Sequence, residues 1–353
     1  MPNGLHFYRN IRYNSKQEHV SEEKPVEKRA VVCLGELLVD FVPEENGLPL
    51  SEVQTFRKAA GGAPANVAAA VAKLGGKSRF IGKVGRDPFG EYLRAALAEA
   101  GVEPALVETD EARTGLAFVS LKENGERDFL FYREPAADML MRKEEVEEAW
   151  LQDAAVFHFG SVSLISEPSR MATLDAARRA RVHGAIVSYD PNVRLPLWRN
   201  ADFARRIIVD QFPFADIVKV SEEEVAFLYG EGVSLEKGAR LILGAGPRCV
   251  VVTLGSAGCR LFTSSGEVTS PGISVQAVDT TGAGDGFVGG LLYRLAADGV
   301  KASRLEEAFA DSAFASGALR FANGIGALTT TRRGAIPALP TREEAERELA
   351  GEA

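Results

Sequence analysis

Four short apolar runs occupy the middle of the chain, and stretches with helical periodicity separate them. The runs are AAVFHFG, AIVSYDP, DIVKVS and CVVVTLG, between residues 154 and 255. Apolar strands that alternate with helices are typical of a parallel sheet covered on both faces. The pattern therefore predicts an α/β fold with a mostly parallel central sheet. Each run ends in a polar or glycine-bearing tip, and ligands of such sheets bind at the carboxyl ends of the strands.

The first ordered element is expected at Ala30–Val42 (AVVCLGELLVDFV), which predicts a single buried strand. A loop and an edge strand are expected over residues 43–62. Pro64 near the start and Gly75–Gly76 at the end predict a capped helix for APANVAAAVAKLGG. The run SRFIGKVG predicts a further strand, and DPFGEYLRAALAEAG a further helix.

Two alternating runs, GLAFVSLKENG and ERDFLFYREP, predict a β-hairpin with its turn at ENGE. Alternation of polar and apolar residues indicates that one face is exposed, as suits a lid. A second hairpin is expected over Glu267–Val278, with its turn at Pro271-Gly272.

Composition excludes several classes of protein. The 353 residues carry a net charge of −8, so a broad nucleic-acid-binding surface is not expected. No apolar run is long enough to span a membrane. The three cysteines form no C-x-x-C pair, which favours a reducing, cytoplasmic location and no zinc site. Residues 1–29 are polar and lack a signal-peptide core, which predicts a flexible N-terminal extension.

The strongest chemical motif is DTTGAGDGFVGGLL, which starts at Asp279. Gly282, Ala283 and Gly284 have little or no side chain and precede an apolar helix, so their backbone N–H groups can form an anion hole. Asp285 lies in the first turn and can take a proton from an alcohol during phosphoryl transfer. The alternative is a plain helix cap on a glycine-rich turn.

The same segment satisfies G-x-G-x-x-G between Gly284 and Gly289, which leaves an NAD-dependent oxidoreductase as an alternative. Its late position argues against dinucleotide binding, and so does Asp285, which would repel a pyrophosphate. A second motif, AGGAPANV, offers Gly61 and Gly62 for close backbone approach and Asn66 for hydrogen bonds to a polyol. The alternative there is again a simple helix start.

The sequence resembles the PfkB, or ribokinase-like, carbohydrate kinases. GGAPANVAAAVAKLGGKSRFIGKVGRDPFG matches the N-terminal signature of that family, and DTTGAGDGFVGGLL matches the C-terminal one. The resemblance covers residues 30–341 and implies a three-layer αβα sandwich with a small β-sheet lid. The lid segments are expected at about 42–60 and 112–136, and a C-terminal tail at 342–353. The implied cofactors are ATP, Mg²⁺ and, in many members, K⁺.

The resemblance also implies roles for individual residues. Those expected to bind the sugar are Asp40, Gly62, Asn66 and Arg194; those near the nucleotide are Asn192, Lys219, Ser221, Thr253, Gly255, Gly258 and Asn323. Glu224 is expected to hold Mg²⁺ through water, and Asp279 and Thr281 a monovalent cation. Ser221 replaces the asparagine of the family N-x-x-E motif, and Ala338 stands where some relatives have serine.

The lid hairpin resembles that of fructokinases, with Phe118, Phe131 and Arg133 as the expected sugar-facing wall. We therefore expect phosphorylation of fructose to fructose 6-phosphate. Arg133 is also suited to a substrate carboxylate, so 2-keto-3-deoxygluconate kinase is the alternative of the same fold. A non-catalytic sugar-sensing protein is an alternative from another class. The exposed hairpin also permits a homodimer through the lid.

Overall fold

The computed structural model describes residues 29–45, 47–121 and 127–350. The predicted extension therefore lies outside the described residues, except for Arg29, and so does most of the predicted ENGE turn. The strands are β1 (Ala30–Leu34), β2 (Leu38–Pro43), β3 (Phe56–Gly61), β4 (Ser78–Gly85), β5 (Glu103–Thr109), β6 (Gly115–Leu121), β7 (Arg127–Tyr132), β8 (Ala154–Gly160), β9 (Ile186–Asp190), β10 (Ile217–Ser221), β11 (Cys249–Thr253), β12 (Gly258–Thr263) and β13 (Gly266–Pro271).

The helices alternate with the strands over most of the chain, as the sequence pattern predicts. They are α1 (Ala63–Lys73), α2 (Pro88–Glu99), α3 (Ser169–Val182), α4 (Ala201–Val209), α5 (Glu222–Tyr229), α6 (Leu235–Gly244), α7 (Ala283–Ala297), α8 (Leu305–Ala310), α9 (Ser312–Thr329) and α10 (Arg342–Ala350). The segment expected as a C-terminal tail thus begins with a helix.

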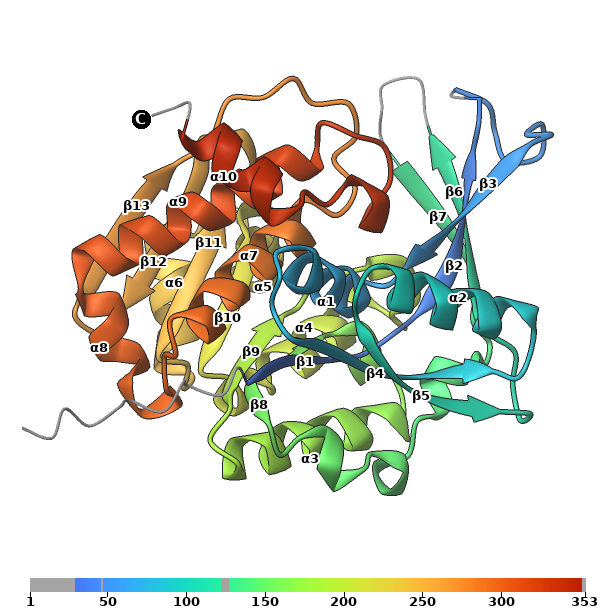
Figure 1. Cartoon of the computed structure of the whole chain (residues 1–353), viewed down its shortest axis with the longest axis horizontal. Helices are drawn as coiled ribbons and strands as arrows, with labels where there is room; N and C mark the ends of the chain where they lie inside the picture. The colour runs from blue at the N-terminus through green and yellow to red at the C-terminus, as the bar shows by residue number, and fades with distance from the viewer. Residues whose placement is uncertain (1–28, 46, 122–126, 351–353) are drawn as a thin grey trace, which may run out of the picture.

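In the described part of the chain, a nine-stranded sheet has the order β13-β12-β11-β10-β9-β8-β1-β4-β5 (Figure 1). Pairing is antiparallel only where β12 meets β11 and β13, so the sheet is mostly parallel. The chain adds strands on one side of β1 and then, from β8, on the other. Such a switch in direction opens a crevice at the carboxyl ends of β1 and β8.

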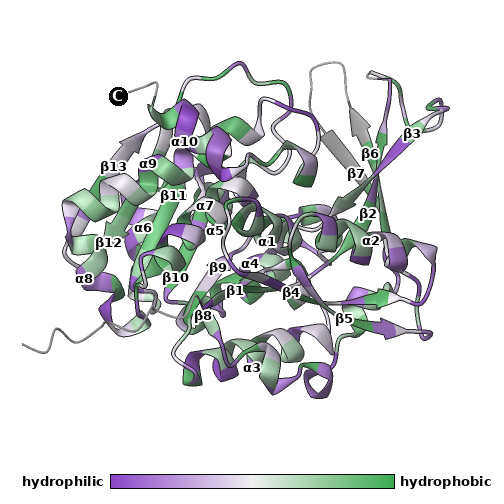
Figure 2. Cartoon of the chain, viewed as in Figure 1, coloured by the Kyte–Doolittle hydropathy of each residue, from purple (hydrophilic) through white to green (hydrophobic). Residues whose placement is uncertain are grey.

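Two hydrophobic cores cover the two faces of this sheet. Val31 and Cys33 of β1 belong to the core beneath α1, α7 and α9, whereas Val32 and Leu34 belong to the core beneath α3, α4 and α6. Successive residues of a strand point to opposite faces, so a strand buried on both sides must be apolar throughout. Figure 2 shows this concentration of hydrophobic residues on the central strands. The predicted three-layer α/β architecture is confirmed.

A four-stranded sheet, with the order β3-β2-β6-β7, forms a separate layer at one end of the molecule (Figure 1). The prediction of one strand over Ala30–Val42 is wrong, because β1 ends at Leu34 and β2 begins at Leu38 in this second sheet. The three residues between them join the two sheets. The chain thus passes from the core into the lid sheet immediately beside the crevice.

Two further elements differ from the predictions. No pattern in the sequence indicates β5, an edge strand that pairs with β4 and is partly polar. The hairpin expected at Glu267–Val278 instead joins β12 to β13, with residues 264 and 265 between them. Pro271 ends β13 rather than forming the turn. No helix among the residues that the structure covers is long and apolar enough to cross a membrane.

Helix α7 packs between α1 and α9 with almost no side chain in between. A methyl group at Gly289 would lie 2.4 Å from Ala70 Cβ on α1, and one at Gly290 would lie 2.9 Å from Ile325 Cγ1 on α9. Real carbon atoms do not approach so closely, so both positions require glycine. This packing fixes the helix that carries Asp285.

Candidate active site

The N-terminus of α7 holds the predicted base. Gly282 precedes the helix with φ +75°, a left-handed conformation that favours glycine, and a methyl group there would lie 3.0 Å from Ala335 Cβ. Asp285 is the third residue of the helix and is 7% exposed. Burial raises the pKa of this carboxylate above its usual range, although its hydrogen bonds lower it.

Two asparagines hold the two carboxylate oxygens of Asp285. Asn66 Nδ2 donates to Oδ2 at 2.8 Å, and Asn192 Nδ2 donates to Oδ1 at 3.0 Å. Asn192 has φ +45°, and its backbone N–H donates to Asp190 Oδ1 at 3.0 Å. The loop after β9 is thus bent so that the amide faces the base. A carboxylate fixed by two donors is oriented to accept one proton.

A positive charge stands beside the anion hole. Lys219 Nζ pairs with Asp190 Oδ2 at 3.1 Å, and a methyl group at Gly284 would lie 3.4 Å from the same nitrogen. Burial opposes the charge on Lys219, but the neighbouring carboxylates, Asp190 first, raise its pKa. The ammonium group therefore stays charged beside the first turn of α7.

The start of α5 carries a capping box. Ser221 Oγ accepts from Glu224 N at 3.2 Å, and Glu224 Oε2 accepts from Ser221 N at 2.8 Å. Glu224 Oε1 also accepts from Val193 N at 2.7 Å. Serine therefore supplies a cap at the family's asparagine position, and Glu224 ties α5 to the loop beside Asn192. Its remaining lone pairs suit the water shell of a magnesium ion, which prefers oxygen ligands.

The residues expected to bind sugar lie across the junction of the two sheets. Asp40 is on β2, and a methyl group at Gly61 would lie 2.3 Å from its Oδ2 atom. Gly62 has φ +122°, and a methyl group there would lie 2.2 Å from the carbonyl oxygen of Glu36. Both glycines therefore allow a backbone approach that no other residue would. The structure places this turn directly before Asn66.

Two of the three residues predicted to form the lid wall, Phe118 and Arg133, are held by contacts within the protein. Phe118 stacks on Phe41 with ring centroids 5.0 Å apart, and it meets Phe56 and Tyr132 edge-on. Arg133 is 5% exposed and forms a close ion pair with Asp138. Because its charge is already matched, Arg133 is poorly placed to neutralise a substrate carboxylate. This does not favour the keto-acid alternative. Phe131, on β7, is partly buried.

The other residues expected near the nucleotide lie at the end of β11, in the turn after it and on α9. Thr253 pairs in register with Ser221, and Gly255 and Gly258 have φ +56° and +102° in the turn that follows. Asn323, on α9, is buried, and its amide donates to Pro271 O at 3.0 Å and to Ser270 Oγ at 3.1 Å. The amide nitrogen of Asn323 therefore anchors β13 to α9.

The segment expected to hold a monovalent cation is assembled from two parts of the chain. Asp279 Oδ1 accepts from Thr281 N, and Oδ2 accepts from Gly334 N at 2.9 Å. Asp279 N donates to Thr330 O at 3.0 Å. The donors gathered here are carboxylate, hydroxyl and carbonyl oxygens, which fit potassium. Within the described ranges, no cluster of three or more His, Cys, Asp or Glu could hold a metal directly.

The G-x-G-x-x-G pattern does not have the structure of a dinucleotide site. Gly284, Gly286 and Gly289 lie inside α7, and Gly289 serves the packing against α1. A dinucleotide fingerprint requires its first glycine on the turn between a strand and a helix. The oxidoreductase alternative therefore has no support in the local geometry.

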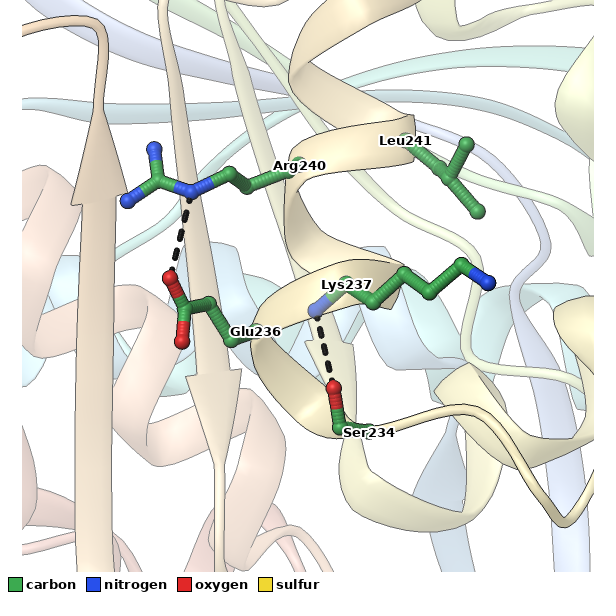
Figure 3. Close-up of a pocket in the computed structure, with 5 residues that line it drawn as sticks. All are labelled: Ser234, Glu236, Lys237, Arg240 and Leu241. Atoms are coloured by element: carbon green, nitrogen blue, oxygen red, sulfur yellow. Dashed lines mark hydrogen bonds and ion pairs between the residues drawn. The ribbon is translucent and has the colours of Figure 1, made fainter.

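A shallow hollow on the surface of α6 has none of these features. Figure 3 shows its lining residues, which are Ser234, Glu236, Lys237, Arg240 and Leu241. Arg240 Nε pairs with Glu236 at 3.4 Å, and Lys237 N donates to Ser234 Oγ at 3.3 Å. Both contacts lie within the first turns of α6, and none of these residues belongs to the site around Asp285.

Comparison with known proteins agrees with this geometry. Residues 28–342 match the model of the pfkB family carbohydrate kinases. The chain belongs to this family. It is 49% identical to fructokinase-2 of Oryza sativa subsp. japonica over 316 residues, covering 89% of this chain and 92% of that protein. The predicted PfkB membership, with a fructokinase-like member as the model, is confirmed, and so is the prediction of a sugar kinase.

Solved structures of similar proteins extend the comparison. The fructokinase of Xylella fastidiosa with bound ATP has a TM-score of 0.85 at 38% identity, covering 92% of this chain and 99% of that one. A double mutant of the fructokinase of Vibrio cholerae O395, with fructose, ADP and potassium ion bound, has a TM-score of 0.80 at 36% identity. It covers 91% of this chain and 98% of that one.

Sequence reasoning missed two charged residues of the site. Glu36 lies between β1 and β2 and is 5% exposed, and its Oε1 atom accepts from Ala63 N at 2.9 Å. Asp138, the partner of Arg133, is also buried. Glu36 directly follows the first apolar run, and polar residues at strand tips were the signal used elsewhere in the chain.

Proposed function

We propose that the protein transfers the γ-phosphoryl group of ATP to the primary hydroxyl of fructose, giving fructose 6-phosphate and ADP. The observation that carries this proposal is the buried carboxylate of Asp285, held by Asn66 and Asn192 beside the N-terminus of α7. The similarity to fructokinases over most of the chain supports the choice of sugar.

In the proposed mechanism, Asp40, Gly62 and Asn66 hold the sugar so that its hydroxyl faces Asp285. Asp285 accepts the hydroxyl proton while that oxygen bonds to the γ-phosphorus and the bond to the ADP oxygen breaks. The N–H groups of Gly282–Gly284 and the ammonium of Lys219 stabilise the charge on the transferred group. Arg194, from the same loop as Asn192, would contact the sugar, and the turn with Thr253, Gly255 and Gly258 would contact the nucleotide phosphates.

Two cations fit the residues present. Glu224 would hold the water shell of Mg²⁺, which when bound neutralises charge on the nucleotide phosphates. Asp279, Thr281 and the carbonyl groups of residues 329–334 would surround K⁺, an ion bound in the Vibrio cholerae fructokinase. Both assignments rest on oxygen donors, those of Glu224 beside the Val193 loop and those of Asp279 beside Gly334.

The experiment is ATP turnover with fructose, 2-keto-3-deoxygluconate, ribose, tagatose and adenosine at matched concentrations. We expect ADP release with fructose to exceed the others by at least tenfold, and Asp285→Asn to lose most of kcat while sugar affinity changes little. Preference for the keto acid would reject fructose as substrate but keep the base. Near-normal turnover by Asp285→Asn would reject the mechanism.

We also propose that two copies pair through the lid sheets in the cytoplasm. Leu130 and Tyr132 are 48% and 60% exposed, and because they are two residues apart on β7, an edge strand of the lid sheet, they lie on the same face. Sedimentation analysis should give a dimer for the natural chain and a monomer for Leu130→Lys. A natural chain that sediments as a monomer at micromolar concentration would contradict this assembly.

A further inference from the structure

Three charged side chains are buried together where the two sheets join. Glu36 lies between β1 and β2, Arg133 follows β7, and Asp138 lies in a short 3₁₀ helix, η1 (Ala137–Leu140). All three are less than 10% exposed. A methyl group at Gly115 would lie 3.3 Å from Arg133 Cγ and 3.4 Å from Asp138 Oδ1. The cluster thus fills the space that Gly115 leaves open, and we call it the junction cluster.

The junction cluster connects the lid sheet to the body of the protein. Arg133 is the residue directly after β7, the final strand of the lid sheet in the sequence. The helix η1 packs against β4 of the central sheet. The ion pair between Arg133 and Asp138 therefore spans the two layers. Glu36 is a second carboxyl group of the cluster, and burial raises its pKa to about 7 although the nearby charge of Arg133 lowers it.

The hydrogen bonds of the junction cluster are incomplete in a complementary way. Among the described residues, Arg133 Nε is a buried donor without an acceptor, and two acceptors of the cluster, Glu36 Oε2 and Asp138 Oδ1, are buried without a donor. Such groups cost free energy while they remain unpaired. Asp138 already accepts from Arg133 Nη2 through its other oxygen, whereas no hydrogen bond joins Arg133 to Glu36, so Glu36 Oε2 is the acceptor that a displacement of either segment would newly pair with Nε.

The other oxygen of Glu36 leads directly to the base. Glu36 Oε1 accepts from Ala63 N, the first residue of α1. Asn66, in the same turn, donates to Asp285. A displacement of Glu36 therefore moves the start of α1, and with it the amide that orients the carboxylate.

We propose that Glu36 is a positioning residue for Asp285, and that Arg133 Nε donates to Glu36 Oε2 when the sugar is bound between the lid sheet and the body. The new hydrogen bond draws the first turn of α1 into the position from which Asn66 holds the base. This inference rests on the proposed function of Asp285, and it adds a connection between the occupied lid and the reacting group.

Two conservative variants each remove one end of the proposed bond. Glu36→Gln keeps an oxygen for Ala63 N but presents an NH₂ group to Arg133. Arg133→Lys keeps the charge opposite Asp138 but lacks Nε. We expect each to lower kcat for fructose about tenfold, and the double variant to be no worse than either single one. Ser234→Ala, which removes a helix cap on α6, is the control and should leave kcat unchanged.

A second measurement does not depend on turnover. Hydrogen exchange at residues 63–66 should slow when fructose and a non-hydrolysable ATP analogue bind to the natural chain, and should change less in Glu36→Gln. Full protection in that variant, or effects on kcat that multiply in the double variant, would overturn the inference. Failure of the proposed function is distinguishable, because the natural chain would then show no fructose-dependent ADP release at all.

Discussion

Asn66 Nδ2 donates to Asp285 Oδ2 at 2.8 Å and so joins the first turn of α1 to the first turn of α7. The two residues are 219 positions apart in the sequence, and each is buried in the folded protein. Burial raises the pKa of Asp285, while the donor from Asn66 is the first of several groups that lower it. The hydrogen bond thus sets both the direction of the carboxylate and the pH range in which it can accept a proton.

Replacement of Asn66 should therefore change the pH dependence of the reaction. In Asn66→Ala the carboxylate loses a donor, so its pKa rises and the acid limb of the kcat profile moves to higher pH. We also expect kcat at its plateau to fall by about tenfold or more, because the base is less well oriented. Asn200→Ala is the control, since Asn200 Oδ1 only caps α4 by accepting from Phe203 N and is not part of the site. An unchanged acid limb would contradict the assignment of Asp285 as the titrating base.

The buried carboxylate of Asp285 should lower the stability of the folded protein at neutral and higher pH. Its pKa is higher in the folded than in the unfolded state, so its favourable contribution is present at low pH and is lost as pH rises through the folded pKa. Asp285→Asn removes the buried charge, and we expect Tm at pH 8 to rise by about 2 °C. The difference between the two proteins should shrink toward pH 4, as scanning calorimetry across this range would reveal. A variant that melts lower at pH 8 would show that the charge is stabilising.

The glycines of α7 give a prediction on packing. Gly289→Ala places a methyl group against Ala70 and Val67 of α1, and overpacking of this kind costs about 1–3 kcal/mol. Activity should fall as well, because α7 carries the base. Gly317→Ala on α9 is the matched control: nothing lies within 4 Å, so removing glycine from the helix should stabilise the protein by roughly 0.5–1 kcal/mol. Urea unfolding of both variants tests this, and equal effects would refute it.

Glu224 and Ser221 share one capping box but should differ in their effect on magnesium. Glu224→Gln removes a carboxylate oxygen beside the loop of Val193, so we expect half-saturation by Mg²⁺ to need severalfold more of the ion. Ser221→Ala removes the cap alone, which costs about 1 kcal/mol of stability. Its magnesium dependence should stay normal. If both variants respond alike to Mg²⁺, Glu224 acts only as a structural cap.

The fold was predictable wherever burial alone determines the sequence. The strands β8–β11 are covered on both faces, so each is a continuous apolar run that marks its own position. The edge strand β5 has a partly exposed, polar sequence that resembles a loop. The break between β1 and β2 falls at Gly35 and Glu36, a glycine and a charged residue inside an otherwise apolar run, and this local signal is too short to show that a strand ends there. That break depends on which sheet each half joins, a tertiary property.

The candidate site was predictable where several features share one short motif. Gly282 and Asp285 occur together in the chain, so the anion hole and the base could be inferred as a unit. Glu36, Arg133 and Asp138 are ordinary charged residues in three separate segments. Arg133 was expected to face the sugar, whereas in the structure its guanidinium group forms an ion pair with Asp138. Such pairing arises only once the segments have folded together.

The packing of α7 between α1 and α9 has a consequence for how this protein fails on heating. Gly289 and Gly290 allow α7 to pack closely against α1 and α9. Few large side chains lie between these helices, so their packing cannot loosen before the helices separate. Loss of alignment at the base then requires the helices themselves to separate, and with them the core on that face of the central sheet. Heat inactivation should consequently coincide with the collapse of the whole domain.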